Sequence, residues 1–380
     1  MVKTFIMFLV FAALCCSAPV FADEVGSCST GGRRTIGGLT LNGHMKLYLA
    51  DFTQGQRYGK VQYNNESAGI HQLITYIGKT ISDTVSVWTE EKLSVSSSAT
   101  PQLGSDIGRD TAAALSWTIS QAYMLLRLPN DYEMKLGTME TMYSEQYGSE
   151  AWWDEQYHLN SSMSSIEAWP DNGIELYKNF DFGSGFNLPA YVYFINGSGR
   201  YVDTNQGKAV LTHFSPEFCC GKLRLLLSSG WGNWDTNSAQ NMYKEAAGFD
   251  WKYTDKTYLM GEYFYQMSEN LDVAMLTAGG ARTKLVDGLT QAFYIRHGFK
   301  YNKFWKCYYE YSHIEKYAGN AAANAKSLIG QYISDNVLAI DYSIATESTI
   351  MAQFSFFDAV SNNGDNLNGI RFTLGWRTTF

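Results

Sequence analysis

After its first 22 residues the chain has no apolar run approaching the roughly eighteen residues that a membrane-crossing helix requires. It has only 6 prolines, and its cysteines form no Cys-x-x-Cys-His haem motif or zinc-ligand spacing. Its 6 histidines lie in no recognisable catalytic motif. The net charge of −8 argues against a nucleic-acid partner. We therefore expect no helical membrane span in the mature chain, no cofactor, no metal site and no nucleic-acid binding.

The amino terminus has the composition of a secretory signal peptide. Lys3 supplies a positive charge, an apolar core covers residues 5–16, and Val20, Phe21 and Ala22 form a small-residue cleavage site. The sequence thus predicts a signal peptide over residues 1–22, a periplasmic lead-in over 23–37 and one main domain over 38–380.

The stretch 246–267 alternates strictly between two kinds of side chain. Phe249, Trp251 and Tyr253 are aromatic, whereas Gly248 and the even positions after it are small or polar. A period of two is the mark of a strand with two different faces. Each arm of this predicted hairpin runs for about ten residues, the length that crosses a bilayer at a tilt. If the aromatic face meets lipid, the polar face must line water, and a closed barrel satisfies both demands.

The same alternation recurs from Leu39 to the end of the chain. We count about sixteen strands, and their connections alternate between tight turns and longer polar loops, among them 52–65, 96–111 and 140–171. Short turns belong to the periplasmic side of such proteins and long loops to the outside. The fold class predicted is therefore all-β, a transmembrane antiparallel β-barrel in the bacterial outer membrane, with lipid and lipopolysaccharide as its surroundings.

The carboxyl terminus supports this prediction. Phe372, Leu374, Trp376 and Phe380 form one apolar face that runs to the last residue. This face resembles the membrane-assembly signal that the barrel-assembly machinery reads.

Several short motifs follow one another over residues 119–380: Gln121-Ala122-Tyr123, Lys135-Leu136-Gly137, Tyr191, residues 194–199, Asp203, Asn205, Lys208, Ala246-Ala247 and Gly261-Glu262-Tyr263. Together they resemble the phosphate-selective porin O and P family among Gram-negative porins. The resemblance implies a homotrimer of sixteen-stranded barrels whose third outer loop, here 140–171, folds inward as a constriction. Phosphate selectivity is not carried over, because no Lys or Arg lies between Lys135 and Lys178.

The charged residues predict a pore with two oppositely charged sides. Alternate residues of a strand face opposite sides of the sheet, and we call this alternation strand parity. Strand parity places the following basic set on the pore wall: Lys46, Arg127, Lys135, Lys222, Arg224, Lys252, Arg296, Lys300, Lys306 and Arg371. The third loop carries an acidic set: Glu140, Glu145, Glu150, Asp154 and Glu155. An inward loop would set a mild cation preference in a passive channel for ions and small polar solutes. In the other reading the loop is a solvated acidic cap that sets no selectivity.

A membrane β-barrel is also compatible with two functions other than that of a porin. One is a barrel sheath around a periplasmic cytochrome in an electron conduit, and the other is an outer-membrane enzyme, for which a nucleophile set beside His is lacking. The mature cysteines, Cys28, Cys219, Cys220 and Cys307, can be a structural bridge or idle thiols.

Overall fold

The computed structural model describes eleven segments of the chain. They are residues 34–36, 39–57, 60–96, 114–143, 171–197, 207–233, 241–277, 280–318, 329–345, 348–360 and 366–379. The chain divides into two units, Met1–Gly32 and Arg33–Phe380, and every described residue belongs to the second. The predicted signal peptide, Cys28 and Phe380 lie outside the described residues.

The described residues of the second unit lie almost wholly in β-strands. They are β1 (Arg34–Ile36), β2 (Leu39–Arg57), β3 (Lys60–Ser82), β4 (Val85–Ser96), β5 (Ala114–Leu128), β6 (Tyr132–Met139), β7 (Asp171–Asp181), β8 (Asn187–Ile195), β9 (Ala209–Phe214), β10 (Glu217–Phe218), β11 (Leu223–Asn233), β12 (Asn241–Trp251), β13 (Thr257–Thr277), β14 (Gly280–Lys300), β15 (Trp305–Ala318), β16 (Ile329–Ala345), β17 (Ser348–Val360) and β18 (Asn366–Thr379). A single 3₁₀ turn, η1 (Pro129–Asp131), joins β5 to β6. Among the described residues no helix is long and apolar enough to cross a membrane.

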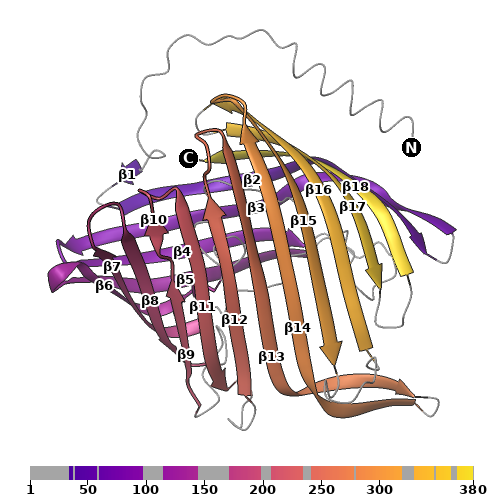
Figure 1. The fold of residues 1–380 in the computed structure, drawn as a ribbon, viewed down its shortest axis with the longest axis horizontal. Helices are drawn as coiled ribbons and strands as arrows, with labels where there is room; N and C mark the ends of the chain where they lie inside the picture. The colour runs from indigo at the N-terminus through magenta and orange to yellow at the C-terminus, as the bar shows by residue number, and fades with distance from the viewer. Residues whose placement is uncertain are drawn as a thin grey trace. The chain divides into compact units, whose positions relative to one another are not determined.

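The strand pairings form a closed ring. Each long strand pairs antiparallel with its neighbours in the chain, β9 pairs with β11 across the short β10, and β18 returns to pair with β2. Leaving aside the short β1 and β10, the ring contains sixteen strands, as the sequence predicts. Figure 1 shows the sequence neighbours side by side, with the yellow β18 against the indigo β2. Because the ring closes, no long strand keeps an unpaired edge.

Tight turns join the strands at one end, which we call the tight-turn end. Asp83 and Thr84 connect β3 to β4, and residues 182–186 connect β7 to β8. Several of these turns use the left-handed region of backbone space, with φ of 60° at Asn130 and 73° at Gly183. Asn and Gly tolerate this region at little cost. The turn chemistry that the sequence shows therefore matches the turns that form.

At the opposite end, called the loop end, the sequence prediction was wrong about one connection. Residues 52–65 were predicted to be a loop, yet β2 and β3 continue as paired strands to Arg57 and from Lys60. β13 and β14 also stay paired as far as Thr277 and Gly280. Beyond the apolar band both faces of a strand are solvated, so the apolar alternation that identifies a strand disappears while the backbone pairing persists.

The two faces of the ring reverse the usual distribution of side chains. On one face, here called the outer face, large apolar side chains are exposed, including Ile295, Tyr309 and Phe356 at 43%, 48% and 52%. On the other, the inner face, charged side chains are buried, including Lys244, Glu262 and Glu310. A soluble protein buries the first kind and exposes the second. The reversal fits a ring whose outer face is covered by lipid.

Many apolar residues of the inner face gather in one large cluster, and Tyr308, Val337 and Ala339 form a smaller one. The large cluster joins Tyr193 and Ile195 of β8 to residues of β9, β12, β13, β14 and β15, and it includes Met139 and Tyr143 at the end of β6. Strands that are distant along the ring are thus linked through the interior.

We predict that Ile295→Arg, on the outer face of β14, lowers the free energy of unfolding by about 2–4 kcal/mol in lipid, because the guanidinium would have to enter hydrocarbon. The measurement is unfolding of the vesicle-inserted protein by guanidinium chloride. Thr290→Arg, on the inner face of the same strand, is the matched control and should cost clearly less. Equal costs for the two variants would contradict the assignment of the faces.

Candidate pore

Four residues of the basic set, Arg127, Lys135, Arg224 and Arg296, are paired with carboxylates. Lys135 Nζ lies 3.4 Å from Glu175 Oε1, and Arg224 Nη2 lies 3.3 Å from Asp250 Oδ2. Arg127 Nε, exposed at the tight-turn end, lies 3.9 Å from Glu133 Oε1. In each case the two residues stand directly opposite each other on neighbouring strands. Cross-strand pairs of opposite charge are the arrangement that stabilises a sheet face.

The tightest of these pairs joins Arg296 of β14 to Glu310 of β15, which are also direct cross-strand partners. The Arg296 Nη2 and Nε groups lie 2.6 Å and 2.9 Å from Glu310 Oε2, and both side chains are fully buried. The guanidinium also lies 4.7 Å from the ring centroid of Tyr308. A buried charge needs such a partner, since desolvation alone would be costly. Arg296 is therefore a fixed part of the wall.

The acidic partners were missing from the predicted pore wall. Buried carboxylates of the strands include Glu90, Glu175, Asp250, Glu262, Glu310, Asp335 and Asp341. Strand parity alone could have found most of them, since it had already put basic residues on the same face. What parity could not give was the register that places Glu175, Asp250 and Glu310 directly opposite basic residues. The inner wall thus carries charges of both signs and is not uniformly basic.

The remaining members of the basic set lie in different surroundings. Arg371 of β18 is buried, with its guanidinium 5.9 Å from the Phe357 ring centroid. Lys222 and Lys252 line a cavity at the tight-turn end. The strand that carries Lys46 is described, but its side chain lies outside the described part of the chain.

The first residues of the third loop turn inward and contact a distant part of the ring. Tyr143 is 1% exposed, and its hydroxyl donates to the carbonyl oxygens of Glu245 and Tyr265, at 2.9 Å and 3.1 Å. Its ring packs on Phe264, and the Lys244 ammonium lies 5.2 Å from its centroid. The backbone N–H of Met142 donates to Tyr193 Oη at 3.1 Å. The loop therefore leaves β6 toward the inner faces of β12 and β13.

Electrostatics keep the Tyr143 hydroxyl protonated. Burial raises the pKa of this phenol, and the carboxylates of Glu262 and Glu245 raise it further. The group therefore remains a hydrogen-bond donor to its two carbonyl partners. Of the acidic set, Glu140 lies in this described base of the loop, whereas Glu145, Glu150, Asp154 and Glu155 lie outside the described residues.

Phe372, Leu374 and Trp376, which the sequence predicts to be part of a membrane-assembly signal, share one face of β18, and Trp376 Nε1 donates to Ser348 Oγ at 2.6 Å. Among the described cysteines none forms a disulfide: Cys219 and Cys220 are exposed in a tight turn and Cys307 is half-buried in β15. Within the described part of the chain no group of three or more His, Cys, Asp and Glu side chains could hold a metal ion.

No protein-family model matches the chain, and no curated protein matches it. Solved structures do match over nearly the whole chain. The outer membrane channel DcaP of Acinetobacter baumannii is 10% identical with a TM-score of 0.58, covering 92% of this chain and 100% of its own. An anion-selective porin from Comamonas acidovorans is 11% identical with a TM-score of 0.54, covering 90% and 99%. The trimer form of the outer membrane protein OmpT of Vibrio cholerae is 12% identical with a TM-score of 0.55, covering 90% and 99%.

These likenesses establish the fold. The chain has the antiparallel β-barrel fold of outer-membrane porins. The narrower resemblance to phosphate-selective porins remains a prediction. A fold shared with an anion-selective porin also leaves ion preference to the side chains of each protein.

We predict that Tyr143→Phe loosens the base of the third loop. The substitution removes two hydrogen bonds at constant ring volume, and it should lower the free energy of unfolding by about 1 kcal/mol and increase the noise of the open-channel current. Unfolding curves and single-channel records check both effects. Tyr263→Phe, on the outer face of β13, is the control. A Tyr143→Phe protein that behaves like this control would show that the phenol does not anchor the loop.

Proposed function

We propose that the chain forms a water-filled channel in the bacterial outer membrane for passive diffusion of ions and small polar solutes. The observation that supports this most strongly is the closed ring with charged side chains on its inner face and apolar side chains on its outer face. Charged groups on an inner face need water or partners, and a passive channel needs only a wet interior and a narrow point. In this proposal the tight turns face the periplasm and the loops face outward.

We also propose that the third loop narrows the channel. The inward contacts of Tyr143 and Met142 support this, because they direct the loop into the ring from its first residues. The acidic set of the loop would then add negative charge beside a wall on which Lys135, Arg224 and Arg296 are paired with carboxylates. The net negative charge of the loop would therefore favour cations mildly.

A homotrimer is the assembly we propose. The trimer form of the Vibrio cholerae protein, which shares the fold, supports it. We further propose that residues 1–22 direct export and that the barrel-assembly machinery inserts the chain by binding the face of Phe372, Leu374, Trp376 and Phe380. Lipid and lipopolysaccharide would then surround the outer face.

The test of this function is recording from the refolded protein in planar bilayers under a salt gradient. Stable ohmic steps are expected, and the sign of the reversal potential should indicate cation preference. Exchanging Glu145, Glu150, Asp154 and Glu155 together for their amides should move the reversal potential toward zero or reverse its sign, because the loop would lose its charge.

Asp131→Asn with Asp181→Asn is the matched control, since both carboxylates lie at the tight-turn end, away from the loop. An unchanged reversal potential in the loop variant would refute the role of the loop. A folded protein that gives no conductance at all would refute the channel.

A further inference from the structure

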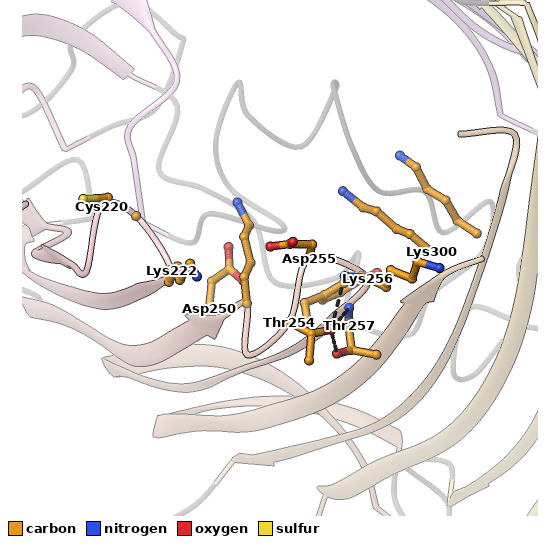
Figure 2. Close-up of a pocket in the computed structure, with 12 residues that line it drawn as sticks. Cys220, Lys222, Asp250, Thr254, Asp255, Lys256, Thr257 and Lys300 are labelled. Carbon is orange, nitrogen blue, oxygen red and sulfur yellow. Dashed lines mark hydrogen bonds between the residues drawn. The ribbon is translucent and has the colours of Figure 1, made fainter. Parts of the chain in front are cut away.

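A cavity of about 330 Å³ lies at the tight-turn end, beside the turn after β10 and the turn between β12 and β13. Its lining contains five lysines: Lys222, Lys252, Lys256, Lys300 and Lys306. Two aspartates, Asp250 and Asp255, also line it, so three positive charges remain in excess. Figure 2 shows the labelled residues running from Cys220 on one side to Lys300 on the other, with Asp250 and Asp255 between them.

The backbone holds these lysines next to one another. The Lys252 N–H donates to the Lys222 carbonyl at 2.7 Å, and the Lys300 N–H donates to the Lys256 carbonyl at 2.7 Å. Lys300 also stands directly opposite Lys306 on the neighbouring strand. Like charges placed directly opposite each other destabilise a sheet. Although Lys306 also faces Asp341 on β16, its contact with Lys300 places like charges together, unlike the pairs that Lys135, Arg224 and Arg296 form.

Four of the five lysines are not engaged in ion pairs within the described residues. Lys222, Lys252, Lys256 and Lys300 make no ion pair with any carboxylate in the described part of the chain. The turn that carries Lys256 is fixed, because the Thr254 hydroxyl accepts the N–H groups of Lys256 and Thr257 at 3.2 Å and 3.0 Å. The lysines thus lie around a cavity whose wall is already ordered.

One acceptor in the cavity wall has no donor. Asp250 is only 7% exposed, and its Oδ2 atom accepts from Arg224 Nη2 at 3.3 Å. Its Oδ1 atom is buried and accepts no hydrogen bond from the described residues. A buried carboxylate oxygen left without a donor is costly, and a ligand that brings a donor would relieve that cost.

We propose that this cavity binds small anionic solutes that also carry an ammonium group, the class of the acidic amino acids. The carboxylates of such a solute would take charge-assisted hydrogen bonds from the lysines. Its ammonium group would donate to Asp250 Oδ1. The volume of the cavity lies at the lower end of the range for small-molecule sites, roughly 300–1,000 Å³, as a free amino acid requires. The inference rests on the proposed function, since the channel would bring the solute to this mouth.

The test is titration of L-glutamate into the compartment facing the tight-turn end of single channels at low salt, where screening is weak. Glutamate is expected to produce resolved current blockades with a saturable dependence on concentration. Succinate, which has both carboxylates but no ammonium group, should bind about tenfold more weakly, as expected for one lost charge-assisted hydrogen bond. Equal binding of the two solutes would overturn the role of Asp250, and absence of blockades would overturn the site.

Lys252→Gln with Lys300→Gln should weaken glutamate binding by about tenfold or more, because two charged donors are lost. Lys303→Gln is the matched control: Lys303 is exposed in the tight turn before β15 but does not line the cavity. If the first double variant fails to fold, Lys222→Gln with Lys256→Gln tests the same claim. Double variants that fold, conduct and bind glutamate as tightly as the control would overturn the proposal.

Failure of this inference is distinguishable from failure of the proposed function. A protein that conducts but shows no glutamate blockades is a channel without this site. A protein that does not conduct refutes the channel, and calorimetric titration of the detergent-solubilised protein with glutamate then decides the site on its own.

Discussion

The structure depends on the hydrogen bonds of the backbone. In hydrocarbon no water can pair with a free N–H or C=O group, so each strand that crosses must be paired on both sides. The pairings from β18 to β2 and from β9 to β11 meet this requirement by closing the ring. Closure separates the two faces of every strand, and the alternation of side chains then follows. Large apolar groups such as Ile295 meet the outside, whereas charged groups such as Glu310 turn inward.

Charge on the inner face is organised by register. Lys135 with Glu175, Arg224 with Asp250 and Arg296 with Glu310 are direct cross-strand partners, so their fields largely cancel at a distance. In the proposed channel, a passing solute would then be influenced mainly by the net negative charge of the third loop and by the net positive charge of the cavity at the tight-turn end. A solute would meet a negative and a positive region in turn.

The fold could be predicted from the sequence because the side chains alternate with a period of two along most of the chain. Turn residues mark where many of the strands end. The strand ends at the loop end could not be predicted, because the residues from Thr53 to Arg57 are all small or polar and show no apolar alternation. Parity placed Arg296 and Arg224 on the inner face. It could not show that Glu310 and Asp250 stand opposite them, since register depends on pairing between strands. The inward path of Tyr143 depends on contacts with residues more than a hundred positions away and has no local signal.

On this interpretation the inner face of the ring meets water and the outer face meets lipid. The most direct measurement is the reaction of single cysteines with a charged, membrane-impermeant methanethiosulfonate, in a background where Cys219, Cys220 and Cys307 are replaced by serine. Thr290→Cys and Gln266→Cys, on the inner face, are predicted to react rapidly and to reduce the channel current. Phe293→Cys and Leu338→Cys, on the outer face, are predicted to stay unmodified in lipid. Modification of the outer positions with protection of the inner ones would contradict the account.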